Sequence, residues 1–311
     1  MKAIGILLPV FIMMFLGGLS RKKQWISVEQ KEGAKKIVFR ILFPALIFHV
    51  IFTSDLAANF VHQILYLDIA WLIIFMIGKR LSGRIAEPYR TIAPYLLMTC
   101  EGGNVALPLY ITIAGAAYAI HIVTFDVAGI IINFGIVPIL VARESSSATS
   151  VKGLLKNIIT NSFVIAVVVG LILNLTGLYG WLVASSFRSV YTNTMTMILA
   201  PITGIILFTL GYDFKIELKT LSALLRLTVI RLLGCVLIIA GFFLIFPGKM
   251  SDCYFRTAVL LYFMCPTGFP VPLQLTPLCK EEGQEQFMSA FISLYMIIAM
   301  IAYVVLILYQ P

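Results

Sequence analysis

The chain has 311 residues, of which 60% are hydrophobic and 12% charged, and its formal net charge is +9 at pH 7. About one quarter of the residues of a soluble globular chain are charged, so the composition excludes an ordinary water-soluble domain. The basic residues lie between apolar runs and not along one face of a soluble module, which argues against binding to nucleic acid. We therefore expect the lipid bilayer to surround the chain.

Apolar runs long enough to cross a membrane follow one another along the sequence. A helix needs about 20 apolar residues to cross the hydrocarbon core, so the length allows about ten spans with short connections. The predicted spans are residues 4–19, 37–52, 60–77, 91–113, 117–140, 158–175, 193–212, 221–246, 255–278 and 287–309. Residues 4–19 also resemble a signal peptide, but the stop-transfer pattern Arg21-Lys22-Lys23 follows at once, so we expect a first helix here. The sequence predicts an all-α integral membrane protein.

The connections between spans are alternately rich and poor in lysine and arginine, and this pattern sets the orientation. The rich connections follow the first, third, fifth, seventh and ninth spans and hold Arg21, Lys22, Lys23, Lys31, Lys35, Lys36, Lys79, Arg80, Arg84, Arg90, Arg143, Lys152, Lys156, Lys215, Lys219, Arg226 and Lys280. The opposite side holds only Lys2, Arg188, Lys249 and Arg256. Because basic loops stay in the cytoplasm, we predict a multi-pass protein of the cell membrane with both termini outside the cytoplasm.

The two halves of the sequence share landmarks in the same order. In the fourth and ninth spans these landmarks are Arg90-Thr91, Cys100 and Pro108 against Arg256-Thr257, Cys265 and Pro272. Five spans in each half would give the halves opposite orientations, as in transporters built from inverted repeats. We therefore expect a first five-helix repeat over residues 1–142, a cytoplasmic linker over 143–157 and a second, inverted repeat over 158–311.

Glycine and proline interrupt the fourth and ninth spans at mid-membrane depth. The helix-breaking residues are Gly102, Gly103 and Pro108 in the fourth span and Pro266, Gly268, Pro270 and Pro272 in the ninth. Asn104 suits a helix N-cap and Pro270 a first helical turn, so each span is expected to resume as a new helix near the membrane centre. The free N–H groups of two such N-termini favour an anion such as a carboxylate. The alternative is that the breaks only kink the helices for packing.

Residues 100–110, with the sequence CEGGNVALPLY, resemble the fourth-helix signature of the auxin efflux carrier family, which includes bacterial malate permeases. Pro266-Thr267-Gly268 is similar to the proline break in the ninth helix of that family. The resemblance implies that the two interrupted helices cross in a mobile domain of helices 3 to 5 and 8 to 10, beside a dimerising scaffold. It also implies that Asn104 contacts the substrate. The ninth span departs from the family, because prolines and Gln274 stand where some members have another asparagine.

The predicted substrate site is this crossing of the two interrupted helices. Its candidate residues are Gly103, Asn104, Val105, Gly268, Phe269, Gln274 and Arg231, although Arg231 would alternatively neutralise a carboxylate of the protein or reach the headgroups. The candidates for coupling or gating are Glu101, Asp126 and Asp68, because a charge within the membrane is costly to keep. Glu101 is expected at the C-terminal end of a half-helix, where the dipole favours its protonation or a bound cation. The alternative for each carboxylate is a structural hydrogen bond, and for Asp68 this is the simpler interpretation.

The three histidines, His49, His62 and His121, are scattered, and the sequence holds no known catalytic or metal-binding motif. We therefore expect no enzyme, no metal and no cofactor, apart from coupling to protons or sodium. The predicted function is elevator-type secondary transport of a small organic anion such as malate, by a homodimer. One alternative is a sodium-coupled organic anion symporter of the bile-acid symporter type, with Glu101, Asn104 and Gln274 as possible sodium ligands. A binding or sensory membrane protein without transport is another.

Overall fold

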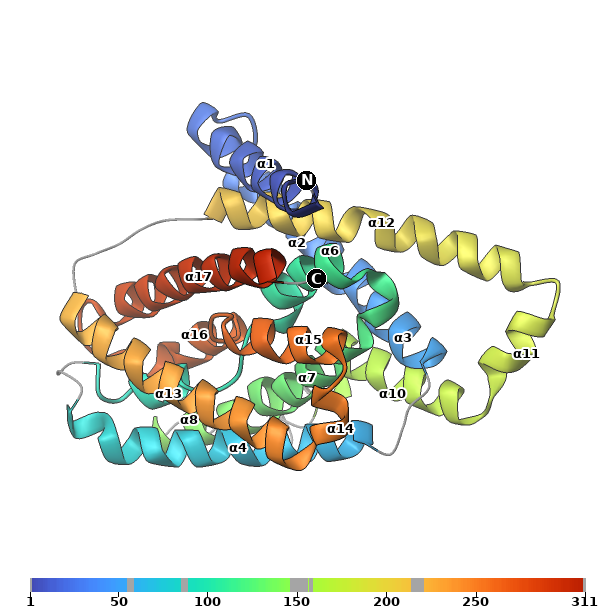
Figure 1. Ribbon diagram of the computed structural model, residues 1–311. Helices are drawn as coiled ribbons and strands as arrows, with labels where there is room; N and C mark the ends of the chain where they lie inside the picture. Colours follow the sequence, from blue (N-terminus) through green and yellow to red (C-terminus); the bar gives the residue numbers. More distant parts are fainter. Residues whose placement is uncertain are drawn as a thin grey trace.

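The computed structural model describes residues 2–54, 59–84, 89–145, 156, 159–213 and 221–309, and over these ranges it contains helices and no strand (Figure 1). Within the described ranges, seven helices are long and apolar enough to cross a membrane: Gly5–Lys23, Val28–Thr53, Phe60–Leu81, Ile120–Glu144, Arg188–Asp213, Ser222–Ile245 and Gln284–Tyr309. They correspond to the predicted spans 1, 2, 3, 5, 7, 8 and 10. The predicted all-α, multi-pass membrane protein is therefore confirmed.

The three other predicted spans are helical but irregular. The sixth is the bent pair Ser162–Leu175 and Leu178–Ala184, whose axes differ by 71°. The fourth and ninth contain the shorter apolar helices Gly102–Ala114 and Cys253–Phe263. Ten crossings and an inverted repeat thus stay predictions, and most of the predicted linker 143–157 lies outside the described residues.

The elements have the following bounds. The α-helices of the first half are α1 (Lys2–Lys23), α2 (Val28–Ile37), α3 (Phe43–Thr53), α4 (Asn59–Leu81), α5 (Ala93–Leu96), α6 (Leu107–Ala114), α7 (Ile120–Ile130) and α8 (Val137–Glu144). Those of the second half are α10 (Ser162–Leu175), α11 (Leu178–Ala184), α12 (Arg188–Asp213), α13 (Leu221–Ile245), α14 (Pro247–Met250), α15 (Cys253–Phe263), α16 (Pro270–Leu275) and α17 (Gln284–Tyr309). Short 3₁₀ turns are η2 (Ser82–Arg84), η4 (Ala116–Tyr118) and η6 (Thr276–Leu278), and π-helical turns are η1 (Val38–Leu42), η3 (Gly102–Ala106) and η5 (Ile131–Ile136).

Each of the three π-helical turns ends two residues before a proline. These prolines are Pro44 after η1, Pro108 after η3 and Pro138 after η5. Proline lacks an N–H group, and its ring crowds the carbonyl of the preceding turn, so a locally widened turn relieves the clash without ending the helix. This explains why η1 joins α2 to α3, and η5 joins α7 to α8, as continuous membrane-length helices.

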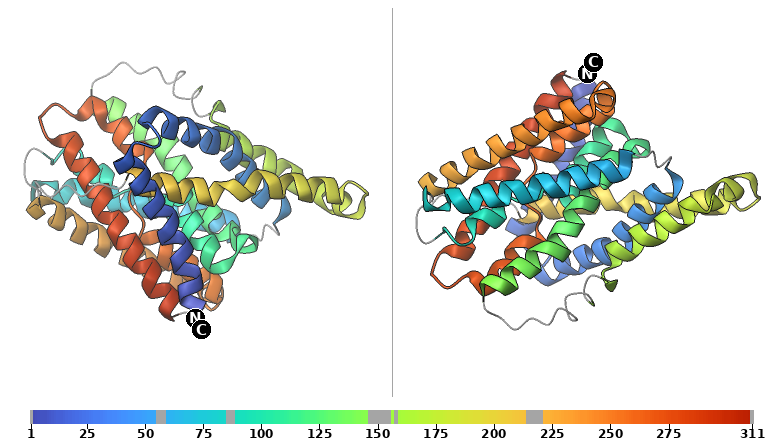
Figure 2. Two further views of the ribbon diagram at one scale, coloured as in Figure 1. Left: turned by 90° about the horizontal axis from the view of Figure 1, so that it is seen from above. Right: turned by 90° about the horizontal axis from the view of Figure 1, so that it is seen from below.

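The helices form two groups that lie side by side (Figure 2). One group contains α1 to α3 and α10 to α12, in which α1 packs along α12 and α3 along α10. The α1–α12 contact is so close that a side chain at Gly17 would collide with the backbone at Phe208, and one at Gly211 with the backbone at Met14. The other group contains α4 to α8 and α13 to α17. Both chain termini lie at the same end of the molecule (Figure 2).

Candidate functional site at two interrupted helices

The predicted breaks in the fourth and ninth spans are present, and they touch one another. Between α5 and η3 the chain is not helical over residues 97–101, the first interruption; between α15 and α16 it is not helical over residues 264–269, the second interruption. The N–H of Glu101 donates to the carbonyl of Pro266 at 2.7 Å. Thr99 adopts a positive φ of 51°, a conformation that a β-branched residue rarely takes, so the first interruption is locally strained.

The guanidinium of Arg231, on α13, lies between the two interruptions and binds both. It donates to the carbonyls of Leu96 at 2.6 Å and Thr99 at 2.8 Å in or beside the first, and to the carbonyl of Cys265 at 3.2 Å in the second. It also donates to the hydroxyl of Thr267 at 2.8 Å. Carbonyls at a helix C-terminus lack partners and carry partial negative charge, so a cation is the group that stabilises both ends at once.

This placement corrects the interpretation of Arg231 as a substrate ligand. Its side chain is only 1% exposed, which also rules out a reach toward the headgroups, and its guanidinium lies over the ring of Tyr295 at 4.8 Å. The physical reason is that irregular backbone within a membrane needs protein partners, and Arg231 supplies them. Arg231 therefore holds the two interruptions together without facing the central cavity described below.

The carboxylate of Glu101 occupies the place where the sequence predicted a free anion site. One of its oxygens, Oε1, accepts the N–H of Asn104 at 3.0 Å and the Asn104 side-chain amide at 2.5 Å. The other, Oε2, accepts the N–H of Phe269 at 2.6 Å, directly before α16. Glu101, which is only 6% exposed, thus bonds the N-terminal ends of both resumed helices.

Two local predictions are wrong for this reason. Glu101, and not Asn104, is the N-cap residue of η3, with φ −82° and ψ 94°. Glu101 also lies at the start of a half-helix, whereas the sequence placed it at the end of one. A carboxylate is a stronger hydrogen-bond acceptor than an amide and is favoured by the positive end of the helix dipole, so it takes the capping position. Pro270 begins α16, as predicted.

A second carboxylate, Asp126 on α7, lies against the first turn of η3. A side chain at Gly102 would collide with the Asp126 carboxylate, and one at Gly103 would come within 2.7 Å of the Phe43 ring. Both glycines are therefore required by close approach of their neighbours. Asp126 and Glu101 flank the same helical turn, so like charges would repel each other there if both were ionised.

Asn133, on η5, contacts both interruptions. Its Oδ1 accepts the hydroxyl of Thr99 at 3.0 Å, and its backbone carbonyl accepts the side-chain amide of Gln274 at 2.7 Å. A side chain at Gly268 would come within 2.6 Å of the Asn133 amide. Gln274 and Gly268 thus shape the crossing through Asn133.

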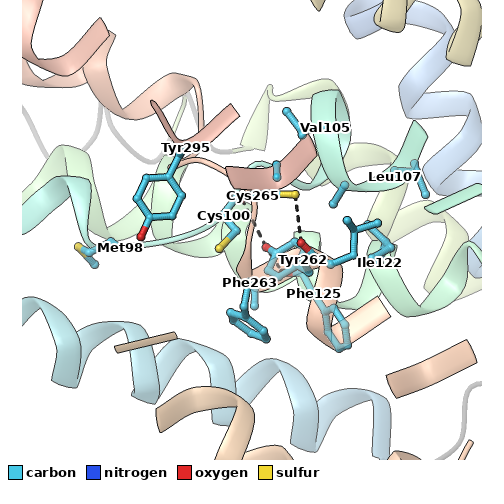
Figure 3. Close-up of a cluster of buried hydrophobic side chains, with 14 of the residues drawn as sticks. Met98, Cys100, Val105, Leu107, Ile122, Phe125, Tyr262, Phe263, Cys265 and Tyr295 are labelled. Atoms are coloured by element: carbon cyan, nitrogen blue, oxygen red, sulfur yellow. Dashed lines mark hydrogen bonds between the residues drawn. The ribbon is translucent and has the colours of Figure 1, made fainter. Parts of the chain in front are cut away.

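An apolar layer supports the crossing from beneath. Tyr262 lies beside Cys100, Cys265 and Phe125 and donates its hydroxyl to the carbonyl of Phe125 at 3.1 Å (Figure 3). All of these side chains are buried. They keep water from the hydrogen bonds of the interruptions, so the polar contacts above act in a medium of low dielectric.

A cavity of about 520 Å³, here called the central cavity, opens beside the crossing. Its lining residues are Lys35, Phe39, Arg40, Phe43, Cys100, Glu101, Gly103, Asn104, Asp126, Ile130, Asn133, Phe134, Phe163, Phe269, Pro270 and Leu273. The two cations, Lys35 and Arg40, come from α2 and η1, whereas the carboxylates Glu101 and Asp126 come from the crossing and α7. Most of the remaining wall is aromatic or aliphatic.

The structure separates the predicted site residues into two sets. Those that line the central cavity are Glu101, Gly103, Asn104, Asp126, Phe269 and Pro270. Those absent from its lining are Asp68, Gly102, Val105, Pro108, Arg231, Pro266, Gly268, Pro272 and Gln274. Lys35 was missed because lysine near a predicted loop was interpreted only as a topology signal, and the lining residues Phe39, Phe43, Phe134 and Phe163 were missed as well. For Lys35, its spacing of four residues from Lys31, on a helix continuous with the second span, was the available clue.

No protein-family model matches the sequence, and no curated protein matches it either. The geometry of the crossing and of the central cavity is therefore the basis for assigning a function.

Proposed function

We propose that the protein is a secondary transporter of a small organic anion, which binds in the central cavity beside the crossing. The observation that carries the proposal is a cavity bordered by two interrupted helices, with cations on one wall and hydrogen-bonded carboxylates on the other. Interrupted helices are tolerated in a membrane where they are buried in protein or border a cavity, and transporters use them as binding sites.

The lining of the central cavity favours an anion that has an apolar body. Lys35 and Arg40 supply positive charge, and the side-chain amide of Asn104 supplies a polar group at the crossing. Most of the remaining contact surface is apolar, which suits a hydrophobic or aromatic framework. A carboxylate such as benzoate satisfies both features, whereas malate carries a second carboxylate and a hydroxyl that need further polar partners.

Coupling is proposed to involve Glu101 and Asp126. While Glu101 is ionised, its oxygens accept the N–H groups of Asn104 and Phe269 that an incoming anion would otherwise use. Protonation would remove the repulsion between this carboxylate and the substrate, and this supports proton symport. Sodium is the alternative coupling ion, because Glu101, Asp126 and Asn104 together offer oxygen ligands.

The larger architecture belongs to the same proposal. Two groups of helices side by side are what an elevator mechanism needs, with α4 to α8 and α13 to α17 moving against α1 to α3 and α10 to α12. Ten crossings in two inverted repeats are compatible with chain termini at one end of the molecule. A homodimer through the static group, α1 to α3 and α10 to α12, and extracytoplasmic termini complete the proposed arrangement.

Uptake into proteoliposomes tests the proposal. We expect labelled benzoate to accumulate under an inwardly directed proton gradient and to exchange against unlabelled benzoate inside. Malate, assayed in parallel, measures how strongly the apolar wall favours benzoate over malate. Accumulation that requires sodium and ignores the pH gradient would favour the symporter of the bile-acid type. Folded protein that moves neither anion under pH, sodium or voltage gradients would contradict transport.

A further inference from the structure

A second, smaller space of about 70 Å³, here called the side chamber, lies next to the central cavity. Lys35, Asn104 and Phe269 border both spaces. The side chamber is also bordered by Asp213, the last residue of α12, and by Ser293 on α17. Lys35 therefore lies in the wall between the proposed substrate cavity and a smaller compartment that is bordered by the carboxylate of Asp213.

Asp213 holds two lysines of α2, one on each oxygen. Its Oδ2 is 3.0 Å from Nζ of Lys35, and its Oδ1 is 2.7 Å from Nζ of Lys31. The lysines are four residues apart and so share one face of the helix. A carboxylate at the end of α12 faces the negative pole of the helix dipole, so Asp213 depends on these cations for its stability.

The two lysines differ in what else surrounds them. Lys31 is 5% exposed, contacts Glu32 as well as Asp213, and borders neither space. Lys35 is 24% exposed, and its one ion pair among the described residues is with Asp213. The single negative charge of Asp213 cannot neutralise two lysines. Lys31 has a second negative charge beside it, that of Glu32. Of the two lysines, Lys35 is thus the one that an anion in the central cavity would attract.

We propose that Asp213 is the resting counterion of Lys35 and that the transported anion replaces it. The proposal rests on the proposed function, because the replacing anion is the substrate. Lys35 then determines affinity for the anion, and Asp213 competes with the substrate from within the chain. Binding of the anion to Lys35 would release one of the two ion pairs between α2 and the end of α12.

Amine acylation tests the counterion directly in purified full-length protein. Acetic anhydride is applied to wild type, Asp213→Asn and Lys31→Gln, and acetylation of Lys35 is measured by mass spectrometry relative to exposed Lys36. An amine engaged with a carboxylate is shielded, and an ion pair of about 1 kcal/mol corresponds to about fivefold. We expect Lys35 acetylation to rise about threefold to fivefold in Asp213→Asn and to stay near wild type in Lys31→Gln. Benzoate should lower it again in Asp213→Asn.

Three outcomes separate this inference from the transport proposal. Equal Lys35 acetylation in wild type and Asp213→Asn would overturn the counterion role. A rise without protection by benzoate or malate, in protein that still takes up either anion, would overturn the replacement alone. The same rise with neither protection nor uptake would overturn both the replacement and the proposed function.

Uptake kinetics give a second readout. Because Asp213→Asn removes a competitor, we expect its KM for benzoate to fall about threefold to fivefold, and that of Lys35→Gln to rise by a similar factor. Lys31→Gln is the matched control, since it removes a lysine from the same carboxylate but none from the cavity wall. A KM that changes as much in Lys31→Gln as in Lys35→Gln would contradict a specific role for Lys35.

Discussion

Arg231→Met is expected to destabilise the protein more than any other single substitution discussed here. The change leaves the carbonyls of Thr99 and Cys265 without their shared donor, within a buried layer that water does not reach, whereas the carbonyl of Leu96 still accepts the hydroxyl of Thr267. Each buried polar group without a partner costs about 1–3 kcal/mol, so a total loss of several kcal/mol is expected. Losing the buried charge recovers some desolvation energy, but the carbonyls belong to the backbone and cannot be replaced by apolar groups.

Thermal unfolding in detergent, followed by size-exclusion chromatography, measures this effect. Arg231→Lys should lie between wild type and Arg231→Met, because an ammonium keeps the charge but cannot reach both interruptions with a planar fork of donors. Leu233→Met, at an exposed position of the same helix, is the control for a change on α13 itself. Arg231→Met with the thermal stability of Leu233→Met would show that the carbonyls find other partners.

Glu101→Gln is expected to abolish proton-driven accumulation while leaving exchange of the anion intact. Glutamine keeps the shape of the side chain and one acceptor oxygen, but it carries no charge and binds no proton. It therefore resembles the protonated acid, whose side chain competes less strongly with a substrate carboxylate for the N–H groups of Asn104 and Phe269. One proton per cycle allows about tenfold accumulation for each unit of pH difference, equivalent to about 1.4 kcal/mol.

The comparison that measures coupling is the ratio of net uptake to exchange at fixed pH gradients. In Glu101→Gln we expect the internal concentration of benzoate to approach the external one, at a rate of exchange close to that of wild type. Asp126→Asn is the matched variant, since it neutralises the other carboxylate beside η3 without altering the cap. If Glu101→Gln accumulates benzoate as wild type does and Asp126→Asn does not, the coupling residue is Asp126.

The sequence was informative wherever a property depended on local composition. Apolar runs predicted the membrane-spanning helices, and Pro266 predicted the second interruption where the structure has it, whereas the first interruption ends just before Gly102 and Gly103, which begin η3. These signals are local, because glycine and proline change the backbone of their own turn. The presence of Asn104 beside the cavity was anticipated by the same argument, supported by a resemblance to known carriers.

The partners of the interruptions depended on contacts between distant segments and were not predicted correctly. Arg231 is far in sequence from Leu96 and Thr99, and nothing near it indicates that α5 and α15 both end at its guanidinium. Glu101 was assigned to the wrong end of a helix because the exact turn at which η3 begins depends on Asp126 and Phe269 as well as on local residues. The sequence therefore predicted an open anion site, whereas in the structure a carboxylate of the protein, that of Glu101, occupies it.

Uptake by Asn104→Ala tests the central claim most directly, namely that the anion passes through the cavity beside the crossing. The substitution removes the side-chain amide from the cavity but keeps the N–H of residue 104, which still bonds Glu101. A lost hydrogen bond to a charged ligand is worth about 1.5–3 kcal/mol, so kcat/KM for benzoate should fall at least about tenfold while the melting temperature changes little. Unchanged uptake, or a loss that only follows the amount of folded protein, would contradict the account.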